Sequence, residues 1–140
     1  MKRANLNEDE VTRIIIMSTM TMQDTGALAD LIAQRSASGG LDLGCHYYIC
    51  GDGEVLRPVA CEQRGDFIPR YGRTSIVIVL EGGLDEESKP TKYYSTDQLV
   101  ALQTIVRHLG SLYPMAQPTF YRELFRGINP VIEHEDYLNA

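Results

Sequence analysis

Two runs of branched aliphatic residues place the strongest constraint on what this chain can fold into. The run at 12–19 (Thr-Arg-Ile-Ile-Ile-Met-Ser-Thr) is apolar and β-branched almost throughout, and the run at 75–80 (Ser-Ile-Val-Ile-Val-Leu) has the same character. Neither run alternates between apolar and polar residues, so each is expected to form a strand that is buried on both faces. Two such strands indicate a sheet with helices packed across it.

The segments between these runs predict the element order β-α-β-β-β-α-β. Residue 24 or 25 is expected to cap a first helix that ends at the glycines 39–40, and Ser95 or Thr96 to cap a longer helix that ends before Pro114. Residues 46–57 are typical of a β-hairpin around Gly-Asp-Gly, residues 58–73 are expected to form a long surface loop, and residues 119–121 a short last strand. This order implies a single α/β domain with a central mixed β-sheet flanked by helices.

The charge balance excludes two classes of partner. The 140 residues include 19 acidic and 13 basic side chains, which gives a net charge of −6. Nucleic-acid binding needs an excess of lysine and arginine to displace phosphate counterions, and docking on anionic lipid needs the same excess. The apolar runs are also far shorter than the roughly 20 residues of a membrane-spanning helix. We therefore expect no nucleic acid and no membrane among the partners.

The ends of the chain and its cysteines bear on domain organisation and location. Residues 1–11 form a polar leader without the apolar stretch of a signal peptide, so we expect a protein that is cytoplasmic at synthesis. Residues 12–132 are expected to form the domain, and residues 133–140 an acidic C-terminal tail. The odd number of cysteines, without a Cys-x-x-Cys pair, predicts reduced thiols, and we expect Cys50 and Cys61 to be buried or inert.

Four segments, in the expected order and with nearly unchanged spacing, resemble motifs of one enzyme family. They are 40–49 (Gly-Leu-Asp-Leu-Gly-Cys-His-Tyr-Tyr-Ile), 51–57 (Gly-Asp-Gly-Glu-Val-Leu-Arg), 75–83 (Ser-Ile-Val-Ile-Val-Leu-Glu-Gly-Gly) and 94–99 (Tyr-Ser-Thr-Asp-Gln-Leu). The family is that of the zinc-dependent N-acetylmuramoyl-L-alanine amidases, which includes short bacteriophage lysozymes and the peptidoglycan recognition proteins. The resemblance covers roughly residues 12–132 and implies an amidase-like and peptidoglycan recognition protein-like fold.

The resemblance also identifies the positions where this family binds its zinc ion. Two histidines and one cysteine or aspartate hold the metal there and leave an open position for water. At these positions the chain has Met17, Tyr121 and Asn129, whose side chains are poor zinc ligands. Two further positions that support catalysis in the family hold Cys45 and Gly127. We therefore expect a pseudoenzyme without zinc, in which Met17, Cys45, Tyr121 and Asn129 still lie in one cleft.

No other set of residues in the sequence predicts catalysis. Cys45 and His46 are adjacent in an expected strand, so their side chains point to opposite faces and cannot form a nucleophile–base pair. We expect His46 to be a buried structural histidine and His108 to be an exposed surface residue. His134 lies among acidic residues and is expected to belong to a solvated tail.

Several side chains remain that could bind a ligand in the former active-site groove. Peptidoglycan-type ligands are bound through aromatic platforms and convergent polar groups, and arginine pairs with carboxylates. The family's tryptophan–histidine pair in the first helix is replaced here by Gln34-Arg35. Residues of these types are more often ordinary loop residues than ligand-binding ones. The candidates are Phe67, Arg70, Tyr71, Arg73, Arg122, Glu123 and Arg126.

The sequence thus favours a catalytically inactive amidase homologue that binds a peptidoglycan fragment or a protein partner through the former active-site groove. One alternative is an active peptidoglycan amidase that uses unconventional metal ligands. A second alternative is a phage-encoded structural or regulatory protein that acts in a bacterial host and binds a host or viral protein. No bound cofactor is expected in the favoured interpretation, and zinc in particular is expected to be absent.

Overall fold

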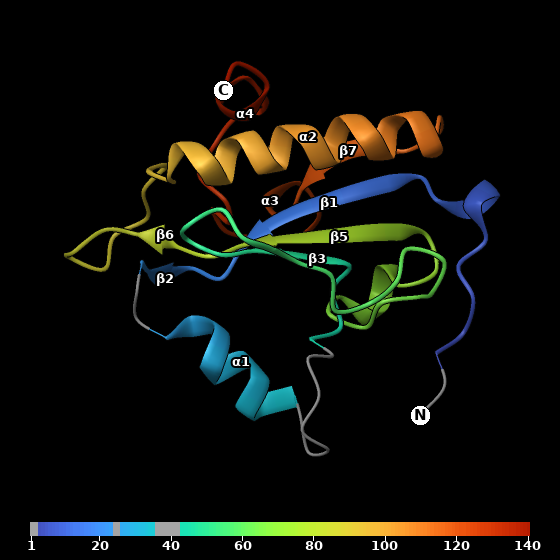
Figure 1. The fold of residues 1–140 in the computed structure, drawn as a ribbon, viewed down its shortest axis with the longest axis horizontal. Helices are drawn as coiled ribbons and strands as arrows, with labels where there is room; N and C mark the ends of the chain where they lie inside the picture. Colours follow the sequence, from blue (N-terminus) through green and yellow to red (C-terminus); the bar gives the residue numbers. More distant parts are fainter. Residues whose placement is uncertain (1–2, 24–25, 36–42) are drawn as a thin grey trace.

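A five-stranded mixed sheet, in the order β4-β3-β5-β1-β7, forms the centre of the molecule (Figure 1). The computed structural model describes residues 3–23, 26–35 and 43–140. Four strands are parallel and β4 is antiparallel to β3, which confirms the mixed sheet. The strands are β1 (Arg13–Ser18), β3 (Tyr47–Ile49), β4 (Val55–Leu56), β5 (Ser75–Leu80) and β7 (Gln117–Phe120).

The two aliphatic runs form the two central strands of this sheet. β1 pairs with β5 along its whole length, from Arg13 opposite Ser75 to Ser18 opposite Leu80. On its other side β1 pairs with β7, so its backbone is hydrogen-bonded at both edges. All six residues of β5 are buried. The prediction that both runs are buried on two faces is therefore confirmed.

Helices cover both faces of the sheet. α2 (Thr96–Leu112) and α4 (His134–Leu138) lie on one side, and α1 (Ala27–Arg35) lies on the other (Figure 1). The predicted cap of α2 is confirmed, because Ser95 Oγ accepts from the Gln98 backbone N–H at 3.1 Å and Gln98 Oε1 accepts from the Ser95 N–H at 3.0 Å. The ends predicted for α1, at 24–25 and 39–40, lie outside the described residues.

Alternation of side chains along β1 and β5 divides the core into two layers. Ile14, Ile16 and Ile78 pack on the α2 side, together with Leu102 and Leu109. The intervening residues of both strands pack on the other side; these are Ile15 and Met17 of β1 and Val77 and Val79 of β5. Leu28, Leu31 and Ile32 of α1 pack against them. The C-terminal end of β1 therefore presents Met17 to the layer beneath α1.

The last eight residues are not the solvated tail that the sequence indicated. Tyr137 of α4 is fully buried in the α2-side core, and the ring of His134 stacks on Phe120 with 4.1 Å between ring centroids. The acidic side chains around these two residues suggested a solvated segment. Burial of a large apolar side chain stabilises a fold by roughly 1.5–3 kcal/mol, so the one buried tyrosine is enough to hold the segment against the domain.

The N-terminal segment is also packed against the domain. Leu6 and Val11 are buried in the α2-side core, and the Leu6 backbone N–H donates to the Glu62 carbonyl at 2.8 Å. A short 3₁₀ helix, η1 (Glu8–Glu10), lies between these two residues. The polar leader of the sequence therefore contributes two apolar side chains to the core.

Residues 58–73 differ from the predicted surface loop. Val59, Cys61 and Ile68 are buried, and a 3₁₀ helix, η2 (Pro69–Tyr71), interrupts the segment. A small parallel sheet of β2 (Thr21–Met22) and β6 (Gly83–Leu84) was not predicted, because strands of two residues carry no recognisable period. A short helix, α3 (Tyr121–Leu124), follows β7 directly. Among the described helices, none combines the length and apolar content that a membrane span requires.

Candidate functional site

A pocket of about 360 Å³ lies at the carboxyl end of β1. Carboxyl ends of parallel strands are the usual place for ligand sites in open α/β sheets. The size lies within the range of roughly 300–1,000 Å³ that small-molecule pockets occupy. Its walls come from residues 17–21, from Ala27, Asp30 and Leu31 of α1, and from Phe67 and Asn129.

The connection between β1 and β2 forms a fixed wall of this pocket. Thr19 Oγ1 accepts from the Gly82 backbone N–H at 2.9 Å and pairs with Thr21 Oγ1 at 2.7 Å. Between them Met20 has φ of 54°, in the left-handed region that residues with a side chain rarely adopt. Such a conformation costs about 1–3 kcal/mol and persists where neighbouring contacts hold it. These hydrogen bonds hold the Met20 side chain at the pocket.

Asn129 lies at the edge of the pocket and joins two distant segments of the chain. Its Oδ1 accepts from the Ser18 backbone N–H at 2.8 Å, and its Nδ2 donates to the Ser18 carbonyl at 3.0 Å. Ser18 ends β1 and is 1% exposed. The amide thus continues the backbone pairing of β1, and both of its polar ends are engaged in this contact.

The other positions that the family resemblance assigns to the active site contribute differently. Met17 is 9% exposed and lines the pocket. Cys45 is fully buried and Tyr121 half-buried in the same hydrophobic cluster as Met17, but neither lines the pocket. The Tyr121 ring stacks on Phe125 with centroids 4.5 Å apart. The expectation of one shared cleft is therefore met by Met17 and Asn129 only, because packing draws the other two side chains into the core.

These residues do not fit a zinc ion. Zinc in proteins takes thiolate, imidazole or carboxylate ligands, whereas the chain offers a thioether, a phenol and a neutral amide at the three positions. The Asn129 amide is already held by the backbone of Ser18. Gly127 has φ of 120° and provides no side chain. The chemistry of the donor set therefore disagrees with the metal that the family resemblance implies.

Phe67 lines the pocket, whereas Arg122 and Glu123 are used in folding. The Arg122 guanidinium donates to the carbonyls of Pro130 and Ile132, pairs with Glu133 and lies over the Phe120 ring. Glu123 Oε2 accepts from the Phe120 backbone N–H at 2.6 Å at the start of α3. Both side chains thus fix the C-terminal segment, and neither reaches the pocket wall.

The other predicted groove residues lie away from the pocket wall. The Arg70 guanidinium lies 5.7 Å from the centroid of the Tyr71 ring. Arg73 forms an exposed ion pair with Glu10 at 3.6 Å, and Arg126 is exposed. A ligand-binding role for these residues stays a prediction, because a larger ligand could extend beyond the pocket.

His46 is a structural histidine, as predicted. It is fully buried; its Nδ1 accepts from the Val77 backbone N–H at 3.1 Å, and its Nε2 lies 2.8 Å from the Gln63 carbonyl oxygen. Burial lowers the pKa of His46, so the neutral ring is favoured. Since the backbone occupies both ring nitrogens, His46 is not a base for Cys45. His108 is exposed, which confirms the prediction for that residue.

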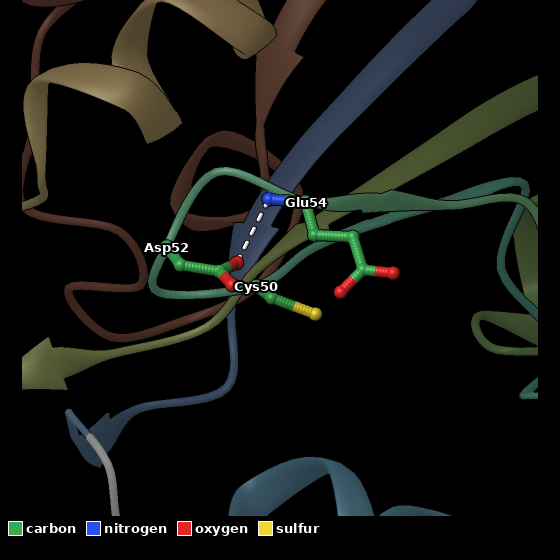
Figure 2. Close-up of side chains that lie close together, drawn as sticks. All are labelled: Cys50, Asp52 and Glu54. Atoms are coloured by element: carbon green, nitrogen blue, oxygen red, sulfur yellow. Dashed lines mark hydrogen bonds between the residues drawn. The ribbon is translucent and has the colours of Figure 1, made fainter.

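One group of potential metal ligands, which the sequence analysis did not identify, lies at the β3–β4 hairpin (Figure 2). Ligand atoms of Cys50, Asp52 and Glu54 lie within 4.8 Å of one another. Asp52 Oδ1 accepts from the Glu54 backbone N–H at 2.9 Å, which makes it part of the turn. Burial, together with the neighbouring carboxylates, raises the pKa of the Cys50 thiol to about 11. Asp52 and Glu54 are exposed, and exposed acidic groups of this kind are common in proteins without a bound metal ion.

Asp30 is a pocket residue that the sequence analysis missed. It lies on α1 between Ala27 and Leu31, and all three line the pocket. The spacing i, i+3, i+4 places them on one face of the helix. The sequence alone gives no signal for Asp30, because α1 approaches the end of β1 only in the folded chain.

Two curated relatives share the sequence pattern. The endolysin of Enterobacteria phage K11 is 32% identical over 99 residues, which are 71% of this chain and 65% of that protein. The endolysin of Klebsiella phage KP32 is 27% identical over 96 residues, which are 69% of this chain and 63% of that protein. The chain thus matches just under two thirds of the length of each endolysin. No protein-family model matches the chain.

Solved structures share the fold. The N-acetylmuramoyl-L-alanine amidase LysC of Clostridium intestinale has a TM-score of 0.69 at 20% identity, covering 100% of this chain and 95% of its own. The endolysin of the Thermus scotoductus bacteriophage Ph2119 has a TM-score of 0.75 at 16% identity, covering 98% and 88%. Drosophila peptidoglycan recognition protein PGRP-LB has a TM-score of 0.71 at 19% identity, covering 92% and 79%.

The fold thus defines a class, that of mixed-sheet domains shared by phage endolysins, amidases and peptidoglycan recognition proteins. Within that class the phage endolysins add sequence similarity over most of this chain. The chain therefore has the fold of N-acetylmuramoyl-L-alanine amidases and peptidoglycan recognition proteins, and its sequence is similar to those of phage endolysins.

Proposed function

We propose that this chain is a catalytically inactive relative of phage endolysins that binds the peptide part of a peptidoglycan fragment in the pocket beside β1. The observation that carries the proposal is the state of Asn129. Its amide is hydrogen-bonded twice to the backbone of Ser18, while the pocket next to it keeps the volume of a small-molecule site. The fold thus retains a binding cavity at a place where the side chains are unsuited to metal catalysis.

The loss of catalysis is supported by the chemistry of the remaining residues. Amide hydrolysis in this family depends on a zinc-bound water, and the donor set here is Met17, Tyr121 and Asn129. The nearby thiol of Cys45 is fully buried and its neighbour His46 is held by backbone groups. A nucleophilic mechanism needs a nucleophile and a base within hydrogen-bond reach, and these two residues do not supply it.

The choice of ligand is supported by the relatives. An N-acetylmuramoyl-L-alanine amidase shares this fold, and so do peptidoglycan recognition proteins, whose name states what they recognise. These likenesses support peptidoglycan as the ligand of this chain. The pocket has apolar walls from methionine, leucine and phenylalanine side chains, which suits the alkyl portions of a peptide. The endolysin relatives also support a phage origin.

Isothermal titration with a soluble muramoyl tetrapeptide tests the proposal. The wild-type chain is expected to bind the peptide, and Phe67→Ala is expected to weaken binding about tenfold, because it removes an aromatic wall of the pocket. Tyr93→Ala is the matched control, since Tyr93 is 80% exposed and lies outside this pocket. Absence of binding by the wild-type chain, or equal affinity of the Phe67→Ala variant, would contradict the proposal.

The two alternatives make different predictions in companion experiments. An active amidase with unconventional ligands would release peptides from purified cell walls. A phage regulatory protein would capture a host or viral protein and would not bind the tetrapeptide. The donor set argues against the first alternative, and the retained pocket favours peptide binding over the second.

A further inference from the structure

Most polar groups in the pocket wall are already hydrogen-bonded within the protein. Ser18 Oγ donates to the Gly82 carbonyl at 2.6 Å and accepts from the Tyr94 hydroxyl at 2.8 Å. The hydroxyls of Thr19 and Thr21 pair with each other at 2.7 Å. The Asn129 amide is engaged by Ser18, as described above. These groups contribute little free hydrogen-bonding capacity to a ligand.

The Asp30 carboxylate is the exception. It is exposed on α1, and it makes no hydrogen bond or ion pair with any residue that the structure describes. It is also the only charged side chain among the described residues that line the pocket. The remaining wall is mainly apolar and includes Met17, Met20, Leu31 and Phe67.

An apolar pocket with a single carboxylate is complementary to an alkylammonium group. The methylene chain of such a group packs against apolar side chains, while its ammonium end reaches a charged or solvated position at the rim. A carboxylate without an internal partner gains a charge-assisted hydrogen bond from the ammonium without losing one of its own. An acidic ligand group would instead be repelled by Asp30.

We propose that Asp30 selects peptidoglycan stem peptides whose diamino acid carries a free side-chain amine, with the alkyl part of that residue lying in the pocket. The inference rests on the proposed function, because it assumes that a stem peptide enters the pocket. It adds the recognising residue and the chemical group that is recognised. Asp30 acts here as a specificity-determining residue and takes no part in a reaction.

The test uses two synthetic tetrapeptides, L-Ala-γ-D-Glu-L-Lys-D-Ala with an acetylated N-terminus, one with a free lysine ε-amine and one with that amine acetylated. Affinities are measured by titration calorimetry at low ionic strength for the wild type and for Asp30→Asn. Glu135→Gln is the matched control, because it removes one exposed helical carboxylate on α4, on the other side of the sheet.

Acetylation of the amine is expected to weaken binding to the wild type about three- to fivefold, as for a solvent-accessible ion pair. Asp30→Asn is expected to weaken binding of the free-amine peptide by the same factor and to leave the acetylated peptide unchanged. Glu135→Gln is expected to behave as the wild type.

Three outcomes would overturn the inference. Equal affinity of the wild type for both peptides, unchanged in Asp30→Asn, would exclude amine recognition by Asp30 and leave the proposed function intact. Binding of neither peptide would remove the proposed function and this inference together. Equally tight binding of an unrelated lysine-containing peptide, such as acetyl-Gly-Gly-Lys-Gly, would show that the pocket accepts any alkylammonium and does not select stem peptides.

Discussion

Replacing Asn129 with alanine removes both hydrogen bonds that tie the segment after α3 to the end of β1. The Ser18 N–H and carbonyl then lose their partners at 2.8 Å and 3.0 Å. Each such hydrogen bond contributes about 0.5–1.5 kcal/mol net to stability. The combined range is about 1–3 kcal/mol. Because the neighbouring pocket admits water to these groups, we expect a loss near the middle of that range, about 2 kcal/mol, and not at its upper end.

That loss corresponds to a decrease in Tm of roughly 6–8 °C for a chain of this length. Asn129→Asp is the more specific variant, because it keeps the acceptor for the Ser18 N–H and replaces the donor with a carboxylate oxygen facing the Ser18 carbonyl. This repulsion raises the pKa of the new carboxyl in the folded state above its unfolded value of about 3.9. A raised pKa destabilises the fold at neutral pH, and the deficit is recovered as the pH falls through the folded pKa.

The assay is urea denaturation of the wild type, Asn129→Ala and Asn129→Asp, followed by circular dichroism at pH 7 and at pH 4. The control is Asn7→Ala, which removes an exposed hydrogen bond from Asn7 Nδ2 to Glu10 Oε1 and should change stability by less than about 0.5 kcal/mol. An Asn129→Ala variant as stable as the control would show that the two hydrogen bonds to Ser18 do not stabilise the fold. An Asn129→Asp variant whose deficit relative to the wild type grows toward pH 4 would contradict the raised pKa of the new carboxyl.

Three further predictions follow from particular contacts. The triple change Met17→His, Tyr121→His and Asn129→Cys should restore zinc binding. The zinc affinity should be about 10–100-fold below that of a natural site, because supporting hydrogen bonds to the ligands are missing. A folded triple variant whose Tm does not rise when zinc is added would contradict this prediction. Because burial lowers the pKa of His46, the unfolded chain binds more protons, and the unfolding free energy should fall as the pH drops below about 6.5. In denaturation experiments between pH 5.5 and 7.5, the unfolding free energy of His46→Gln should depend less steeply on pH than that of the wild type. An equally steep dependence would exclude His46 as the cause. Tyr137→Ala should destabilise the fold by about 3–5 kcal/mol because Tyr137 is fully buried; a loss below about 1 kcal/mol in denaturant titration would show that α4 is dispensable.

The sequence was informative where a local pattern determines structure. The aliphatic runs of β1 and β5 leave no polar face, so burial on two sides was the simplest arrangement. The capping box from Ser95 to Gln98 fixed the start of α2 because its two hydrogen bonds join residues three apart. The Gly-Asp-Gly turn identified the β3–β4 hairpin for the same reason.

The sequence was less informative where the deciding contact is long-range. The partner of Asn129 lies 111 residues away, and no local pattern indicates that pairing. Tyr137 is surrounded by acidic residues, which concealed its place in the core. Asp30 became a pocket residue only through the approach of α1 to the end of β1. In each case the backbone topology, and not the neighbouring residues, determines the environment of the side chain.

Zinc stoichiometry combined with cell-wall hydrolysis tests whether this chain has lost the metal-dependent amidase activity. The purified chain is incubated with excess zinc, transferred to metal-free buffer and submitted to elemental analysis. The same sample is then assayed for release of peptides from purified peptidoglycan, with the endolysin of phage K11 assayed in parallel for comparison. We expect no stoichiometric zinc and no release of peptides above the buffer control, because the side chains of Met17, Tyr121 and Asn129 are poor zinc ligands. One tightly held zinc ion per chain together with hydrolysis would contradict this expectation.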